Sequence, residues 1–169
     1  MIILVEGNEG TGKTTLINQI IKEMPMVYVK YPKEVKRTNH MYMDFIGMNQ
    51  DIILDRSFIS DMVYRSWDKN DTQMTLVEIA NLFAQWYNSI KIIFCHNDKA
   101  FEKSMSRGED YITDISTHEI IERNYQVIED LIKAYTNCAC FDYNYEENSV
   151  EEVLEFLRGK NVDRCRQRR

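Results

Sequence analysis

An eight-residue segment near the amino terminus constrains this chain more than any other feature. Residues 7–14 read G-N-E-G-T-G-K-T, which fits the pattern G-x-x-x-x-G-K-[ST], and they directly follow the apolar run Ile2–Val5. Three glycines let the backbone curve so that several amide N–H groups point inward, and the first turn of a following helix adds unpaired donors and partial positive charge. The segment is therefore predicted to be a polyphosphate-binding loop between a strand and a helix.

The polar side chains of this loop have expected roles toward a bound nucleoside triphosphate. Lys13 is expected to reach the β- and γ-phosphates as a point charge, and the Thr14 hydroxyl is expected to hold Mg²⁺ between them. The sequence therefore predicts ATP as a ligand and Mg²⁺ as a cofactor. The residues predicted to bind ATP are Asn8, Gly10, Thr11, Gly12, Lys13, Thr14 and Thr15.

Chain length and charge restrict the remaining possibilities. With 169 residues the chain has the size of one domain, and its 27 acidic and 21 basic residues give a net charge of −6. A negative chain argues against a nucleic-acid surface and favours small anions bound at one local cluster of positive charge. No apolar stretch approaches the length of a membrane span, and none of the four cysteines forms a C-x-x-C pair. We therefore expect a cytoplasmic protein with reduced thiols and without nucleic-acid or membrane partners.

Apolar runs alternate with segments of helical periodicity along the chain. The runs predict buried strands at 2–5, 26–29, 52–54, 90–95 and 139–141, and the periodicity predicts helices at 16–24, 41–48, 71–87, 98–105, 114–135 and 150–157. This alternation is typical of the α/β class, with a parallel sheet built from right-handed βαβ units. We assign residues 1–158 to one domain and residues 159–169, which carry five basic side chains, to a solvated tail, with a binding element as the alternative.

A second polar segment follows the third predicted strand. Phosphoryl transfer places two anions in line, so the protein must supply cations on both sides of the transferred group. Arg56 lies just past the end of a strand beside the first, where it can bind the acceptor phosphate bidentately, and Asp55 is placed to bind Mg²⁺ or its waters. The alternative is a structural ion pair between these two side chains. Ser60 and Tyr64 lie four residues apart on one helical face and are expected to face the acceptor sugar, unless Tyr64 is a core aromatic.

Residues 106–114 are expected to form a mobile lid. The segment is polar, contains a glycine and lies between two predicted helices. Its one arginine is Arg107, which could swing over the phosphates, neutralise charge in the transition state and help to exclude water. An ordinary exposed side chain is the alternative for this arginine.

Three segments together resemble the thymidylate kinase family of nucleoside monophosphate kinases. Residues 6–15 are similar to E-G-x-[DE]-G-x-G-K-[ST]-T, and residues 55–64 are similar to D-R-Y-x-x-S-x-x-A-Y, with Ser57 and Val63 as departures. Residues 107–110 are similar to the R-G-x-x-D of the lid in some members. The resemblance implies a three-layer P-loop kinase fold, with helices on both faces of a five-stranded parallel sheet in the order 2-3-1-4-5.

The resemblance also implies roles that the spacing alone does not give. It implies that Glu9 hydrogen-bonds the 3′-hydroxyl of the acceptor sugar, that Tyr64 blocks a 2′-hydroxyl and so selects deoxyribose, and that residues 143–146 line the adenine site. It further implies a homodimer. The short chain is similar to compact viral members of the family, for which the compartment would be the host cytoplasm.

The acceptor itself is less strongly indicated. In the related nucleoside kinases an acid follows the second strand and deprotonates a hydroxyl, whereas this chain carries Lys30, which suits an acceptor that is already an anion. Glu34 lies close to this position in the sequence and could serve as that acid, so a nucleoside stays an alternative acceptor. Tyr42 and Phe45 are expected to stack on the acceptor base, but no arginine follows either one to read the base edge. A preference for thymine therefore rests on the resemblance alone.

These observations lead to one predicted function and two alternatives. We expect ATP- and Mg²⁺-dependent phosphorylation of a deoxynucleoside monophosphate, with dTMP converted to dTDP. A deoxynucleoside kinase that forms the 5′-monophosphate is the first alternative. A nucleotide-binding module that holds ATP without turnover is the second.

Overall fold

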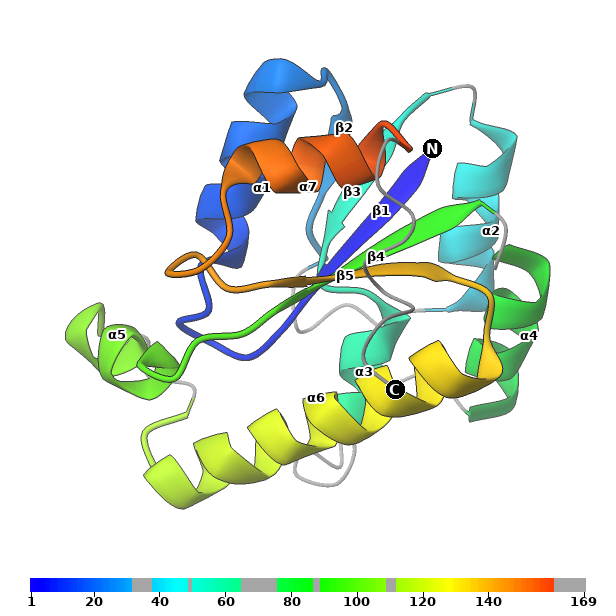
Figure 1. Cartoon of the computed structure of the whole chain (residues 1–169). Coiled ribbons are helices and arrows are strands. Elements are labelled where there is room, and N and C mark those ends of the chain that lie inside the picture. The colour runs from blue at the N-terminus through cyan, green and yellow to red at the C-terminus, as the bar shows by residue number, and fades with distance from the viewer. Residues whose placement is uncertain (32–37, 49, 65–75, 87–88, 109–111, 160–169) are drawn as a thin grey trace.

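The computed structural model describes residues 1–31, 38–48, 50–64, 76–86, 89–108 and 112–159. Its centre is a sheet of five parallel strands in the order β2-β3-β1-β4-β5 (Figure 1). The expected α/β class and strand order are therefore confirmed. The strands are β1 (Ile2–Glu6), β2 (Val27–Val29), β3 (Ile52–Asp55), β4 (Ile90–Cys95) and β5 (Ala139–Tyr143).

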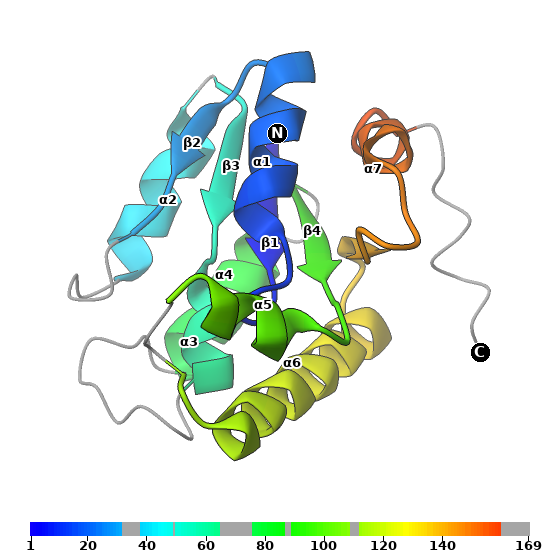
Figure 2. The same ribbon diagram turned by 90° about the vertical axis from the view of Figure 1, so that its left-hand side faces the viewer.

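Helices cover both faces of this sheet and make the fold three-layered. α1 and α7 pack on one face, while α2, α3, α4 and α6 pack on the other (Figures 1 and 2). The helices are α1 (Lys13–Glu23), α2 (Asn39–Gly47), α3 (Phe58–Tyr64), α4 (Leu76–Trp86), α5 (Ala100–Ser106), α6 (Ile115–Tyr135) and α7 (Val150–Leu157).

The central strand β1 is buried along its whole length, as a strand between two helical layers must be. Ile3 and Val5 belong to the core beneath α1 and α7, whereas Ile2 and Leu4 belong to the core on the opposite face. Each fully buried aliphatic side chain of this kind contributes about 1.5–3 kcal/mol through removal of apolar surface from water. The alternation fixes the strand in register, so its carboxyl end delivers the following loop to a fixed place.

Local signals set the starts of the helices that border this loop. Gly12, with φ 85°, immediately precedes α1, and a left-handed conformation of this kind is easily reached only by glycine. The Asp114 side chain accepts a hydrogen bond from the Thr117 N–H and caps α6. Among the helices that the structure describes, none combines the length and apolar character needed to cross a bilayer.

Several predicted segments extend beyond the described residues. The helix predicted at 71–87 is described as α4 only from residue 76 to residue 86. Residues 109–111 of the predicted lid, residues 160–169 of the predicted tail and Glu34 lie outside the described part of the chain. The lid and the tail therefore stay predictions.

The two-sided core leads to a test of stability with a matched control. Val153 in α7 is fully buried, whereas Val77 in α4 is 71% exposed. Because both valines are helical, Val→Ala changes helix propensity equally and differs only in lost packing. We expect Val153→Ala to lower the free energy of unfolding by about 2 kcal/mol and Val77→Ala to change it by less than about 0.5 kcal/mol, as measured by urea denaturation. Equal effects would show that α7 does not cover the core.

Candidate active site

The predicted phosphate-binding loop lies at the carboxyl edge of the sheet, between β1 and α1, where ligands bind in open α/β sheets (Figure 2). Two of its glycines are required by close approach of other backbone. A Cβ on Gly10 would lie 1.9 Å from the carbonyl oxygen of Ala100, and a Cβ on Gly7 would lie 2.3 Å from that of Cys95. Both glycines also have positive φ. The loop is therefore clamped between the end of β4 and the start of α5.

The Lys13 side chain is hydrogen-bonded to the backbone of its own loop. The Lys13 ammonium donates a hydrogen bond to the Asn8 carbonyl oxygen, which also accepts one from the Thr11 hydroxyl at 2.8 Å. Burial, followed by the positive charge of Arg56, lowers the pKa of Lys13 to about 8. A bound polyphosphate would bring negative charge next to the Lys13 ammonium and stabilise its charged form. Thr14 and Thr15 lie in the first turn of α1, directly after Lys13, and are exposed.

Asp55 faces Thr14 across the start of α1. Its Oδ2 atom lies 3.4 Å from the Thr14 hydroxyl, 3.0 Å from the Tyr28 hydroxyl and 3.1 Å from the Lys30 ammonium. Burial would raise the pKa of Asp55, but the charges of Lys13 and Lys30 outweigh it and hold this pKa below its usual value. The carboxyl group is therefore ionised at neutral pH.

A carboxylate beside a threonine hydroxyl fits the expected metal. Mg²⁺ prefers oxygen ligands and usually binds through one or two protein oxygens together with phosphates and waters. Within the described ranges no group of three or more His, Cys, Asp or Glu side chains could hold a metal ion. Asp55 and Thr14 offer two protein oxygens of the kind that Mg²⁺ uses.

Arg56 is the one non-glycine residue with positive φ in the described chain, at 69°. Such a conformation costs about 1–3 kcal/mol and persists where the surroundings impose it, often at functional sites. Here the Arg56 N–H donates to the Val5 carbonyl oxygen at 3.0 Å, and Nη1 donates to the hydroxyl oxygens of Tyr64 at 2.5 Å and Tyr125 at 3.4 Å. Burial would lower the pKa of Arg56, but the two tyrosines and the charge of Glu9 raise it. Arg56, Glu9 and Tyr64 thus share one side of the loop.

A fully buried carboxylate, that of Glu6, lies beneath this arginine. Its oxygens accept hydrogen bonds from Ser57 at 2.5 Å and Ser60 at 2.7 Å, and the Tyr125 hydroxyl lies 3.5 Å away. Burial raises the pKa of Glu6, although both serines and Arg56 oppose the shift. The Ser60 hydroxyl also lies 3.0 Å from that of Tyr125. The Ser60 hydroxyl, which was expected to face the acceptor sugar, is thus hydrogen-bonded inside the protein.

Helix α6 holds the other end of the loop. The Asn8 side chain donates from Nδ2 to the His118 carbonyl oxygen at 3.0 Å and accepts the Glu9 N–H at 2.9 Å. The His118 ring nitrogen Nε2 lies 3.5 Å from the Glu9 carbonyl oxygen. The Asn8 side chain, predicted to bind ATP, is therefore used to tie the loop to α6 and to orient Glu9.

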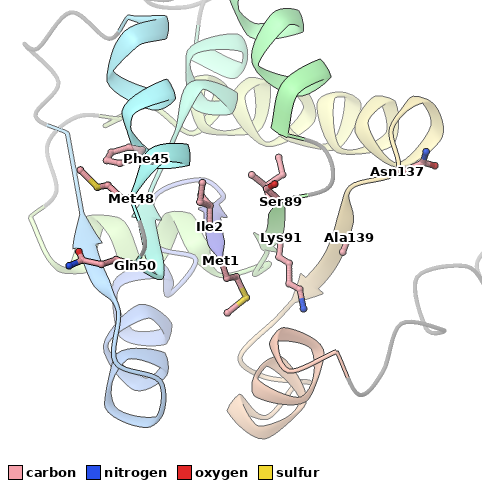
Figure 3. A pocket seen from close by; sticks show the side chains of 10 residues that line it. Met1, Ile2, Phe45, Met48, Gln50, Ser89, Lys91, Asn137 and Ala139 are labelled. Atoms are coloured by element: carbon pink, nitrogen blue, oxygen red, sulfur yellow. The ribbon is translucent and has the colours of Figure 1, made fainter.

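The two aromatic residues predicted to stack on the acceptor base have their side chains buried in the protein. Tyr42 is fully buried in the core, with its ring edge-on to that of Phe58 at 5.3 Å between centroids. Phe45 lines a cavity of about 570 Å³ together with Met1 and Ile2, at the amino edge of the sheet (Figure 3). Both side chains point into the protein because α2 turns its apolar face toward the sheet.

The segment after β5, expected to line the adenine site, contacts both the loop and α5. A Cβ on Gly12 would lie 3.1 Å from the Tyr145 ring, and the Lys103 ammonium lies 3.9 Å above the centre of that ring. Lys99 forms an ion pair with Glu146 at 3.2 Å. These contacts bring α5 next to residues 144–146.

Arg107 lies at the end of α5, and its side chain is exposed. Because residues 109–111 lie outside the described chain, its predicted action in a lid stays a prediction.

Three site residues received no role from the sequence. Glu6 is a charged residue at the end of an apolar strand, which is a signal that could have found it. Tyr125 was part of a periodic helix face, and Tyr28 was part of a predicted strand, so their patterns indicated packing. Their hydroxyl groups contact Arg56 and Asp55, respectively.

An ionic cluster anchors the far half of α6 to the sheet. His96, directly after β4, pairs with Glu122 at 3.3 Å and with Glu129 at 2.8 Å, and Lys133 links Glu129 to Asp142. Burial would lower the pKa of His96, but the two carboxylates raise it to about 10. The cluster therefore holds His96 in its charged form at neutral pH.

This cluster predicts a pH dependence of stability. A histidine whose pKa is higher in the folded chain stabilises fully below its unfolded pKa of about 6.5 and loses this contribution as pH rises through the folded pKa. We therefore expect the stability difference between wild type and His96→Gln, measured by urea denaturation, to be largest near pH 6 and to shrink toward pH 10. His40→Gln, on the exposed side of α2, should match wild type throughout. A difference that does not change with pH would contradict the charged pairing.

Comparison with known proteins gives matches among nucleotide kinases, and no family model matches the chain. The sequence is 29% identical over 108 residues to "Adenylate kinase isoenzyme 6 homolog" from Caenorhabditis elegans, covering 63% of this chain and 59% of that protein. It is 36% identical over 74 residues to "Putative thymidylate kinase" from Acidianus bottle-shaped virus, covering 38% of this chain and 47% of that protein. The matches thus span about half to three fifths of the length of these relatives.

Solved structures share the fold over nearly the whole chain. YorR protein from Bacillus subtilis, in complex with phosphorylated GDP, superposes with a TM-score of 0.76 at 17% identity, covering 94% of both chains. Deoxyadenosine kinase from M. mycoides with bound dCTP superposes with a TM-score of 0.64 at 17% identity, covering 94% of this chain and 100% of that one. At these identities the agreement shows the P-loop kinase-like fold.

Proposed function

We propose that this protein is an ATP- and Mg²⁺-dependent kinase that phosphorylates a deoxynucleoside monophosphate, with dTMP as acceptor and dTDP as product. One observation carries the proposal. Arg56 is held in a strained backbone conformation beside the loop that holds Lys13. The positive charge of Arg56 helps to lower the pKa of Lys13, so the two cations lie close together. A cation on each side of the transferred group is what phosphoryl transfer between two phosphates requires.

On the donor side, the loop amides and Lys13 would bind the triphosphate, and Thr14 and Asp55 would hold Mg²⁺. When bound, Mg²⁺ supplies charge neutralisation at the phosphate oxygens. The clamp on Gly7 and Gly10 keeps the loop in one shape, so its donors need not reorganise when the nucleotide binds.

On the acceptor side, the Arg56 guanidinium would bind the acceptor phosphate, with Glu9 and Tyr64 toward the sugar. An oxygen of that phosphate attacks the γ-phosphorus, the bond from this phosphorus to the β–γ bridging oxygen breaks, and ADP leaves. No base is needed, because the attacking oxygen is already an anion. We also propose that Arg107 reaches the site from the lid.

One observation favours the deoxynucleoside kinase as a second candidate. A hydroxyl acceptor must lose a proton, and burial gives Glu6, near Arg56, the raised pKa of a candidate general base. Both oxygens of Glu6 are occupied by serine hydroxyls, however, and its side chain is fully buried. Deoxyadenosine kinase from M. mycoides shares the fold and shows that such an architecture can serve that reaction.

A panel assay separates these functions. ADP formation is measured with ATP, Mg²⁺ and each deoxynucleoside or deoxynucleoside monophosphate in turn. We expect higher kcat/KM with the monophosphates than with the nucleosides, because two cationic side chains, Lys30 and Arg56, are available to an acceptor phosphate. Among the monophosphates we expect the highest value with dTMP, on the resemblance of the sequence motifs alone. Activity confined to nucleosides would favour the second candidate, and tight ATP binding without turnover would favour a non-catalytic module.

Replacement of Arg56 tests the assignment of the acceptor side. Arg56→Ala should raise KM for the acceptor and lower kcat, with a fall in kcat/KM of about 10²–10³, the usual cost of removing one donor that stabilises transition-state charge. Arg158→Ala, an exposed arginine at the end of α7, should have the activity of wild type. An Arg56→Ala variant impaired only in ATP affinity would contradict the assignment.

A further inference from the structure

One oxygen of Asp55 is unusually crowded. Thr14, Tyr28 and Lys30 all reach Oδ2, at 3.4, 3.0 and 3.1 Å. Two of these partners are neutral hydroxyl groups, and the third is an ammonium group. Lys30 is thus the cation in direct contact with this oxygen, in the part of the site where a divalent cation would bind, and the charge of Lys13 acts on the same carboxylate.

Lys30 differs from the other two partners in how firmly it is held. Its side chain is 57% exposed, whereas that of Asp55 is 2% exposed. The residue directly follows β2, the edge strand whose Val29 pairs with Leu54, so its backbone is fixed beside Asp55 while its long side chain extends into solvent. A half-exposed ion pair of this kind is weak, so Lys30 can leave Asp55 with little loss of packing.

A divalent cation and an ammonium group that contact the same carboxylate oxygen repel each other. A cation bound to Asp55 and Thr14 would lie within a few ångströms of the Lys30 nitrogen, and like charges repel strongly in a site where the carboxylate is shielded from water. Arrival of the metal–nucleotide complex therefore favours release of Lys30. Tyr28 donates a neutral hydrogen bond, so it can continue to orient Asp55 after the exchange.

We propose that Lys30 is an exchangeable counter-ion, which neutralises Asp55 in the free enzyme and binds the acceptor phosphate once the metal–nucleotide complex has replaced it. This inference rests on the proposed function, and it adds a coupling between the two substrates. Arg56 is the next residue after Asp55, so a released Lys30 remains on the side where the acceptor phosphate would bind. Each substrate should then strengthen binding of the other, because such coupling is reciprocal.

The first experiment measures this coupling in the full chain. The Kd of dTMP is determined by calorimetry alone, with Mg²⁺ and the non-hydrolysable analogue AMP-PNP, and with AMP-PNP and EDTA. In wild type we expect Mg²⁺ and AMP-PNP to tighten dTMP binding by about fivefold or more, and AMP-PNP with EDTA to leave it unchanged. Lys30→Met should lose the tightening. Lys22→Met, an exposed lysine in the last turn of α1, should keep it. Tightening that survives in Lys30→Met would overturn the proposal.

The second experiment tests the exchange at the metal itself, without an acceptor or turnover. Mn²⁺ affinity in the presence of AMP-PNP is measured from the electron paramagnetic resonance signal of free Mn²⁺. Lys30→Met should bind Mn²⁺ several-fold more tightly than wild type, because the competing ammonium is gone, whereas Lys30→Arg should resemble wild type. Equal or weaker Mn²⁺ binding in Lys30→Met would show that no exchange occurs.

The two experiments separate failure of the inference from failure of the proposed function. If wild type does not phosphorylate or bind dTMP, the proposed acceptor is wrong, and the Mn²⁺ titration alone decides whether Lys30 competes with the metal. If wild type phosphorylates dTMP but Mn²⁺ affinity is the same in wild type and Lys30→Met, the exchange is wrong and the proposed function stands.

Discussion

The buried carboxylate of Glu6 is the constraint on which the arrangement of the site depends. A carboxyl group without solvent contact is costly unless its oxygens are hydrogen-bonded, and both oxygens here accept hydroxyl groups. Those hydroxyls come from Ser57 and Ser60, on either side of the start of α3, so satisfying Glu6 fixes the chain directly after Arg56. The left-handed conformation of Arg56 is therefore imposed by its neighbours, and its guanidinium lies against the hydroxyl groups of Tyr64 and Tyr125.

Positive charge is concentrated in a protein whose net charge is −6. Lys13, Lys30 and Arg56 lie close to the Asp55 carboxylate, and the carboxyl groups of Glu6 and Glu9 act on Arg56. Burial and the charge of Arg56 nevertheless lower the pKa of Lys13, so the nearby acids do not fully offset the crowding of cations around it. A local cluster of this kind can attract an anion to a protein whose net charge is negative.

The parts of the site that the sequence predicted are those set by local geometry. The glycine spacing located the loop, and the strand end before Asp55 located the pair at residues 55–56, because the carboxyl ends of parallel strands meet at one edge of a sheet. The sequence could not show which polar or aromatic side chains of a helix are turned into the protein. Ser60 and Tyr64 share a helical face, but only packing decides that the first is turned toward Glu6. The same holds for Tyr42, whose side of α2 faces the sheet.

Contacts between segments that are far apart in the sequence could not be predicted from any local pattern. Tyr125 and Glu6 are separated by 119 positions, and Asn8 and the His118 carbonyl by 110. Nothing in a helical period distinguishes an aromatic that fills a core from one whose hydroxyl reaches an arginine. Such residues are found from sequence only if the fold is already known, and here the strand order implied by the resemblance was enough for the sheet but not for the helices above it.

Helix α6 connects the parts of the site that must act together. Over its 21 residues, a length of about 30 Å, it contacts the loop through His118, the arginine through Tyr125 and the end of β4 through Glu129. A rigid rod held at three points cannot shift at one of them without disturbing the others. The ionic cluster at His96 is the third of these contacts, and it ties α6 to the end of β4, where the Cys95 carbonyl oxygen also packs against Gly7 of the loop.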